Sequence, residues 1–484
     1  MRPAAYAMSL WPFSSSTSNI AFGRACETVA SMTTACSFWS PSSRSVRRAF
    51  GVLVPRRGPR CLPKFRMSLI GEGHVSYRSR MALPTPNNFR NLARLATVDI
   101  TPLRRHRDFR LLYIGRFVSL FGNQITFVAV PYQVFTLTHS TFAVGLLGVV
   151  ELAALLTFAL LGGALADALD RRLMVLMSEA ALMVGSMILF GNSLLSHPIV
   201  WLVFVIVSLQ GAFDAMQTPS LAALLPRLVD RDELAAAAAL GSMRSTLGMI
   251  AGPALAGVLI AVAGLPVAYV VDIATFVVGL VCLWLMKAVP PPADAERPSI
   301  RRIAEGLRYA RSRPELMGTY IVDVVAMFFG MPIALFPAIA AGYGGAKVLG
   351  LLYAAIAVGS FLFSATSGWT RNVHRHGRAV VVAATLWGFA IIAFGFAPSL
   401  VVALLCLVAA GAADMMSGIF RNVIWNQTIP DSLRGRLASI ELLSFSGGPL
   451  LGNFESGVVA SLFSVRFSVV SGGVMCVVGC AVAL

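Results

Sequence analysis

Three carboxylates lie deep inside long apolar segments of this chain: Glu151, Asp323 and Glu455. At about 1.5 Å of rise per helical residue, each lies roughly 9–14 Å from one end of its segment, near the middle of a ~30 Å hydrocarbon core. A charged side chain costs about 2.5–3.5 kcal/mol at that depth, so its presence favours a function. A carboxylate that accepts a proton can carry it or bind a cationic group. We predict proton or substrate sites here, with structural hydrogen bonding as the alternative.

The composition indicates a polytopic membrane protein. Of 484 residues, 57% are hydrophobic and 13% are charged, whereas soluble domains carry about 25% charged residues. The net charge of +17 is uneven, since residues 1–100 hold 14 Lys and Arg against three acids. The other cations cluster between apolar segments, as membrane anchors do, so we expect no nucleic-acid partner. The seven cysteines show no paired or metal-like spacing, and no nucleophile or metal motif is present. We therefore expect no metal, no cofactor and no enzyme activity.

Twelve transmembrane helices are predicted. They lie at about 109–135, 142–165, 173–195, 199–221, 238–263, 267–288, 317–341, 346–369, 379–397, 399–425, 438–463 and 468–484. Loops after even-numbered helices carry arginines, while the other loops hold only Lys347 and Arg466. The positive-inside rule then places both termini and the arginine-rich loops in the cytoplasm. The chain has only three lysines against 36 arginines, which hints at a GC-rich bacterial gene, so the predicted localisation is a bacterial cytoplasmic membrane.

The two halves of the chain repeat each other. Gly211-Ala-Phe-Asp214 corresponds to Gly411-Ala-Ala-Asp414, and three further matches follow at offsets of 196 to 204 residues. The predicted domains are an N-terminal extension (1–100), a six-helix bundle (101–288), a linker with an amphipathic helix (289–315) and a second six-helix bundle (316–484). Two such repeats around a central site are typical of an alternating-access carrier.

Other membrane-embedded charges could form a gate or a charge network: Asp214, Asp414, Arg421 and Arg116. Both aspartates are expected nearer the cytoplasmic ends of helices 4 and 10. Arg421 could pair with Asp414 or with the next loop, and Arg116 could instead extend to the membrane surface. Asp272 is expected at the outer interface.

The hairpin between helices 2 and 3 reads Gly163-Ala-Leu-Ala-Asp167-Ala-Leu-Asp-Arg171-Arg172. This hairpin, the twelve predicted helices and the six-plus-six repeat together resemble the major facilitator superfamily. The family hairpin reads roughly Gly-x-Leu-Ala-Asp-Arg-x-Gly-Arg-Arg, so Ala168 and Asp170 depart from it. The resemblance implies the major facilitator fold, all-α with two pseudo-symmetric six-helix bundles. It also implies a conformational latch made by Asp167 and Arg171, with Gly163 and Arg172 as part of the motif.

Finer features resemble the enterobactin-exporter-like branch, which includes siderophore, drug and macrolide efflux proteins. They are Asp108-Phe-Arg-Leu-Leu-Tyr-Ile-Gly115, Leu137-Thr-His-Ser140 and Asp170-Arg-Arg172. Helix 5 carries Gly248, Gly252, Pro253 and Gly257, similar to the antiporter motif of the family. Ordinary packing of small residues is the alternative interpretation.

The ends of the sequence carry separate expectations. The Arg- and Ser-rich N-terminal region could be a transit peptide or the result of an early start codon, with Met67 or Met81 as the true start; we favour the second. The last predicted helix has seventeen residues, about 25 Å, so truncation at Leu484 is possible. Residues 1–100 are expected to be disordered.

The predicted function is export of small amphiphilic molecules, siderophore- or drug-like, by proton antiport across the lipid bilayer. A monomer would suffice, because one chain supplies both halves. The alternatives are a lysophospholipid-type flippase, a small-molecule importer, and, from another class, a membrane scaffold or sensor.

Overall fold

The structure is a computed structural model, and it describes residues 99–168, 170–289 and 307–482. The side chains of residues 159–168 and several within 431–443 lie outside that description. So do the predicted N-terminal extension, apart from its last residues, and most of the predicted amphipathic linker. Within the described residues the chain is helical, and no strand is assigned.

The helices of the first half, here called the N-half, follow the predicted segments closely. They are α4 (Thr101–Arg105), α5 (Arg107–Thr138), α6 (Thr141–Ala168), α7 (Arg171–Ser193), α8 (Val200–Leu228) and α9 (Leu234–Trp284), with a short 3-10 turn η2 (Arg231–Glu233). The 51-residue α9 contains the predicted helices 5 and 6. It leaves helical geometry at Gly264, whose φ is +84°, a conformation that favours glycine.

The second half, here called the C-half, has a broken first helix. It consists of α11 (Pro314–Phe329), η3 (Ile333–Leu335), α12 (Phe336–Tyr343), α13 (Ala346–Thr366), η4 (Ser367–Asn372), α14 (His376–Gly395), α15 (Leu400–Thr428), α16 (Asp431–Leu462) and α17 (Val465–Val482). Pro332 and Pro337 lie in or beside the break. Proline removes a backbone donor and opposes a continuous helix.

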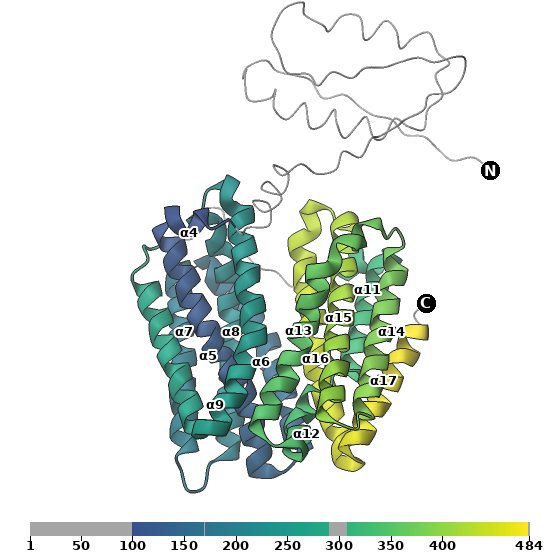
Figure 1. Cartoon of the computed structure of the whole chain (residues 1–484). Coiled ribbons are helices and arrows are strands. Elements are labelled where there is room, and N and C mark those ends of the chain that lie inside the picture. The colour runs from purple at the N-terminus through teal and green to yellow at the C-terminus, as the bar shows by residue number, and fades with distance from the viewer. Residues whose placement is uncertain (1–98, 169, 290–306, 483–484) are drawn as a thin grey trace, which may run out of the picture. The chain divides into compact units, whose positions relative to one another are not determined.

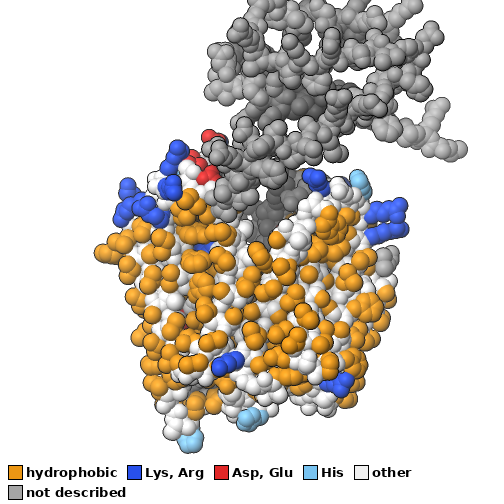
Figure 2. Space-filling model, viewed as in Figure 1, with side chains coloured by type: hydrophobic (Ala, Val, Ile, Leu, Met, Phe, Trp, Pro, Cys, Tyr) orange, Lys and Arg blue, Asp and Glu red, His pale blue; other side chains and the backbone are white. Residues whose placement is uncertain are grey.

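The described helices suit a membrane environment. Ten of them are long and apolar enough to cross a bilayer, and the one covering Arg231–Trp284 includes the interruption at Gly264. The protein is a multi-pass, all-helical membrane protein, while a count of twelve crossings stays a prediction. Figure 2 shows a broad hydrophobic belt, with most Lys and Arg side chains at one end. We call that end, where α5 begins and α8 stops, the basic end.

The most extensive contacts between the two halves are made by two helix pairs, α6 with α16 and α9 with α13. In Figure 1, α6 is blue and α16 yellow, while α9 is teal and α13 green. Each pair crosses at glycines. A Cβ on Gly257 of α9 would lie 2.8 Å from the Cα of Gly350 of α13. One on Gly457 of α16 would lie 2.9 Å from the Cα of Gly145 of α6. All four glycines lie toward the ends of their helices remote from the basic end, so the halves approach most closely there.

Candidate functional site

A cavity of about 260 Å³ lies between the two halves. Helices α5, α6 and α8 line one side, and α13, α16 and the break after α11 line the other. Its polar side chains are Asn123, Thr126, Glu151, Gln210, Asp214, Tyr353 and Asn453. Among the described residues, two carboxylates and no basic side chain line it, so it favours protons, cations or hydrogen-bonding neutral groups.

The helix break lines part of this cavity, and side chains satisfy two of its freed backbone groups. The indole Nε1–H of Trp387 donates to the Gly330 carbonyl at 2.9 Å, and the Ala334 N–H donates to Asn453 Oδ1 at 3.1 Å. Backbone freed from a helix inside a membrane needs such partners. A Cβ on Gly330 would lie 2.6 Å from Trp387 Nε1, so only glycine allows the indole so close. Broken helices beside a central cavity are a recurring feature of secondary transporters.

Glu151 and Asp214 are the acidic side chains of the cavity. Glu151 of α6 makes no hydrogen bond or ion pair with any residue that the structure describes. It packs beside Gly211, where an added Cβ would lie 3.2 Å from the Glu151 Cγ. Asp214 Oδ1 accepts a hydrogen bond from Gln217 Nε2 at 2.6 Å. The cavity therefore holds one anchored carboxylate, Asp214, and one, Glu151, that makes no such contact with the part of the chain that the structure describes.

The expected depth of Asp214 and Asp414 was wrong. Helices α8 and α15 each have 29 residues, and each aspartate is the fifteenth. Both therefore lie midway along their helices and not near one end. The error arose because both helices continue past their apolar runs, to Leu228 and Thr428.

A charge network in the N-half leads to Asp214. Arg116 of α5 forms an ion pair with Glu179 of α7, whose side chain is fully buried. Arg116 Nη1 also donates to Gln217 Oε1 at 3.3 Å, and Gln217 in turn donates to Asp214. Arg116 therefore lies in a charge network and does not extend to the membrane surface. Sequence reasoning missed Glu179, although an acid eight residues into an apolar helix was a usable signal.

The C-half holds a second buried ion pair, between Arg421 of α15 and Asp323 of α11. Their side chains are 2% and 3% exposed. The Ser444 hydroxyl donates to Asp323 Oδ2 at 2.7 Å, and the Phe445 ring lies 5.0 Å from the guanidinium carbon. Arg421 thus pairs with Asp323 first and lies 3.9 Å from Asp414. Asp323 does not line the central cavity.

Asp272 and Glu455 occupy different surroundings. Asp272 was expected at the outer interface, which is wrong: it is fully buried and accepts hydrogen bonds from Thr126 at 2.5 Å and Ser186 at 2.7 Å. It lies eight residues beyond the interruption at Gly264, inside the N-half. Glu455 of α16 is half-buried and outside the lining of the cavity.

The glycines of the helix-5 motif are packing positions. A Cβ on Gly248 would meet the Leu120 side chain, and one on Gly252 would lie 2.5 Å from Gln124 Cβ, both on α5. Gly257 faces α13 of the other half. The carbonyl group of Pro253 also faces α13, because a Cβ added to Gly350 of that helix would meet it. The motif therefore joins α9 to its own half and to the other.

The hairpin between α6 and α7 is described only in part. The side chains of residues 159–168, which include Gly163 and Asp167 of the motif, lie outside the described residues. The Asp170 carboxylate caps α7 by accepting from Leu173 N–H at 3.0 Å. The Arg171 N–H donates to the Val289 carbonyl at 3.3 Å, and Arg172 Nε donates to the Leu283 carbonyl at 2.7 Å. The arginines thus join the hairpin to the end of α9, where carbonyls lack helical partners.

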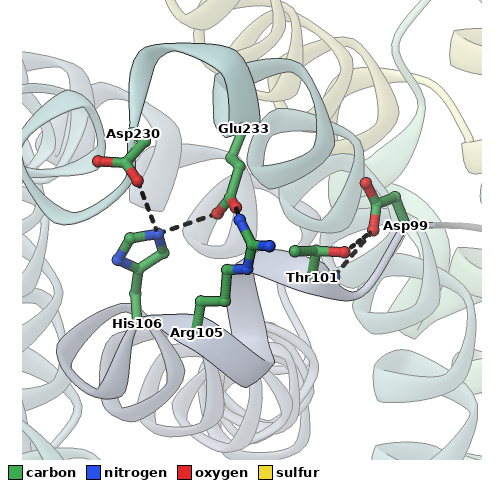
Figure 3. A network of polar contacts seen from close by, with 6 residues as sticks. All are labelled: Asp99, Thr101, Arg105, His106, Asp230 and Glu233. Atoms are coloured by element: carbon green, nitrogen blue, oxygen red, sulfur yellow. Dashed lines mark hydrogen bonds and ion pairs between the residues drawn. The ribbon is translucent and has the colours of Figure 1, made fainter.

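A separate network joins the start of α5 to the connection between α8 and α9 (Figure 3). Glu233 accepts from Arg105 at 3.1 Å and lies 2.9 Å from His106 Nε2, which is 3.9 Å from Asp230. All of these residues lie at the basic end, far along the helices from the central cavity.

Comparisons with known proteins agree on the class. Residues 97–484 match the family described as transmembrane secretion effector. The chain is 28% identical over 384 residues to the enterobactin exporter EntS of Citrobacter koseri, covering 79% of this chain and 92% of the relative. It is 28% identical over 342 residues to the enterobactin exporter EntS of Shigella boydii serotype 18, covering 70% and 82%.

Solved structures show the same fold. A bacterial homologue of the human lysosomal transporter Spinster, inward-facing and unoccupied, aligns with a TM-score of 0.62 at 18% identity, covering 78% of this chain and 96% of that one. A bacterial homologue of the iron transporter ferroportin, also inward-facing, aligns with a TM-score of 0.60 at 16% identity, covering 78% and 98%. The protein is a transporter and not an enzyme. It belongs to the transmembrane secretion effector family of the major facilitator superfamily.

Proposed function

We propose that this protein exports small amphiphilic molecules, siderophore- or drug-like, by proton antiport through alternating access. The observation that carries the proposal is the central cavity, which both halves line and which contains Glu151, a carboxylate without a hydrogen-bond or ion-pair partner among the described residues. The family match and the relatives named as enterobactin exporters support the direction of transport. Lipid bilayer, solute and protons are then the partners, and one chain suffices.

Glu151 and Asp214 would couple solute to protons. An antiporter needs a site that protons and solute occupy in turn, and carboxylates that both can neutralise provide one. Such a lining favours neutral or cationic groups of an amphiphile. A cavity of about 260 Å³ is below the roughly 300–1,000 Å³ usual for drug-sized ligands. One ring or side arm of a larger solute would enter it in this conformation.

Alternating access would use the glycine crossings as its closed gate. With the basic end in the cytoplasm, the contacts Gly257–Gly350 and Gly145–Gly457 close the outer side. The two solved relatives of the fold described as inward-facing are consistent with this assignment. Asp167 and Arg171 would latch the cytoplasmic side in the opposite conformation, with Gly163 and Arg172 shaping the hairpin. Asp323 with Arg421, and Asp414 beside them, would brace the helices of the C-half. Arg116 would connect its ion pair with Glu179 to Asp214 of the cavity.

The test is transport by the full chain in proteoliposomes with an imposed pH gradient. The panel contains a catecholate siderophore, a macrolide, a cationic dye and a lysophospholipid. We expect gradient-dependent movement of at least one amphiphile, which an uncoupler and Glu151→Gln abolish and which Glu455→Gln, outside the cavity, leaves intact. Gradient-insensitive transport by all three proteins would reject antiport. Movement of lysophospholipid alone would favour a flippase, and a correctly inserted protein that moves nothing would favour a scaffold or sensor.

A further inference from the structure

A second cavity, of about 540 Å³, lies near the basic end of the N-half, between α5, α8 and α9. The described residues that line it include two arginines, Arg116 and Arg244, and no acidic side chain. Counting from the basic ends of their helices, the arginines are nine and ten residues in, about 14–15 Å deep at 1.5 Å per residue. Its charge is thus opposite to that of the central cavity.

Arg244 has no counter-charge in the part of the chain that the structure describes. Arg116 is neutralised by Glu179, but Arg244 forms no ion pair there, and its Nε is buried without a hydrogen-bond partner. An ionised side chain inside a membrane bundle normally pairs with an opposite charge. Among the described residues, the cavity therefore carries one positive charge without a counter-charge.

The rest of the lining suits an amphiphile. Ser242, Ser245 and Thr246 lie within two residues of Arg244 on α9, and none of their hydroxyls forms a hydrogen bond with another described group. Phe109 and Leu225 provide apolar walls. A guanidinium with nearby hydroxyl donors is a common arrangement for binding phosphate or carboxylate oxygens.

We propose that this second cavity binds the oxyanion of an amphiphile, a phosphate or a carboxylate, with Arg244 as its main ligand and the neighbouring hydroxyls as further donors. The ligand comes either from the surrounding lipid, as an anionic headgroup, or from solution, as a small amphiphilic anion. The site differs from the acidic central cavity in position and in charge. The proposal does not require transport, because binding can be measured at equilibrium.

The test measures two probes on the purified full-length chain. Phosphatidylglycerol competes with phosphatidylcholine for the protein in native mass spectrometry, and radiolabelled salicylate is followed by equilibrium dialysis. The variants are Arg244→Gln, Arg244→Lys and, as matched control, the exposed Arg231→Gln at the same end. We expect at least one probe to bind wild type and Arg231→Gln alike, to bind about tenfold more weakly to Arg244→Gln, and to be partly restored by Arg244→Lys. Binding should also weaken as salt is raised.

The two probes separate the sources of the ligand. An Arg244-dependent preference for phosphatidylglycerol identifies lipid, and Arg244-dependent binding of salicylate alone identifies a soluble anion. Ala238→Trp fills the cavity without removing the charge of Arg244. If Arg244→Gln fails to fold, Ala238→Trp therefore tests whether the probes bind in this cavity. Equal binding of both probes to wild type, Arg244→Gln and Ala238→Trp would overturn the proposal. A failure to detect export, with Arg244-dependent binding of a probe intact, would contradict the proposed export function and leave the proposed binding site standing.

Discussion

The two halves share a scaffold but use their charges differently. In each half an aspartate stands midway along a 29-residue helix, Asp214 in α8 and Asp414 in α15. Three residues earlier each helix has a glycine that packs on the second helix of its half, Gly211 on Glu151 of α6 and Gly411 on Ile356 of α13. The same position is thus acidic in the N-half and apolar in the C-half.

The buried ion pairs show the same asymmetry. Arg421 and Asp323 are almost fully enclosed, and neither lines the central cavity. Arg116 and Glu179 connect through Gln217 to Asp214, which does line it. An ion pair closed off from the cavity can hold helices together, whereas one connected to it can respond to what binds there. We infer that the N-half carries the coupling charges and the C-half a fixed brace.

The largest expected effect follows from breaking the brace. Asp323→Leu leaves Arg421 charged and buried with only Asp414, 3.9 Å away, as a counter-charge, which should destabilise the protein by about 3 kcal/mol, the lower end of the range for breaking a buried ion pair. Replacing both residues, Asp323→Leu with Arg421→Met, should restore most of that stability. Thermal unfolding in detergent measures both. Glu179→Leu should cost less, because Arg116 keeps its contact with Gln217. Equal losses in the two halves would contradict the distinction.

A bulkier residue at a crossing between the halves should shift the conformation. Gly257→Val places a Cβ 2.6 Å from the Ala346 carbonyl oxygen, and such overpacking typically costs about 1–3 kcal/mol. We expect the halves to separate at the end remote from the basic end. An Ala334→Cys reporter in the cavity lining should then react faster with a membrane-impermeant maleimide added from outside. Gly241→Val is the control on the same helix, since nothing lies within 4 Å of its added Cβ. Equal labelling of both variants would argue against the gate.

The smallest expected effect concerns the link between the N-half ion pair and the cavity. Gln217→Leu removes hydrogen bonds to Asp214 at 2.6 Å and from Arg116 at 3.3 Å. Each such bond contributes about 0.5–1.5 kcal/mol net, so a stability loss of about 1–2 kcal/mol is expected, together with slower export. Gln210→Leu also alters the cavity lining but touches neither charge. If Gln210→Leu slows export while Gln217→Leu does not, the link has no role in coupling.

Much of the fold could be predicted from the sequence because apolar runs of membrane length determine where helices form. Charged residues mark their ends, whereas the segment predicted as one helix at about 317–341 is broken near Pro332 into α11, η3 and α12. The pairing of charges could not be predicted in the same way. Arg116 meets Glu179 across 63 residues, and Arg421 meets Asp323 across 98. Such pairs depend on how helices rotate against each other, which glycine contacts set. The latch residue Asp167 remains a prediction, because its side chain lies outside the described residues.

The most direct test of coupling by the N-half measures proton movement during transport. Proteoliposomes with an internal pH dye compare wild type, Glu151→Gln and the double variant Asp323→Leu with Arg421→Met, using a solute that wild type exports. If the coupling charges lie in the N-half, the double variant still moves protons against solute and Glu151→Gln, equally well inserted, does not. Proton-coupled transport by Glu151→Gln, or a loss of proton coupling only in the double variant, would place the coupling charges in the C-half and contradict this assignment.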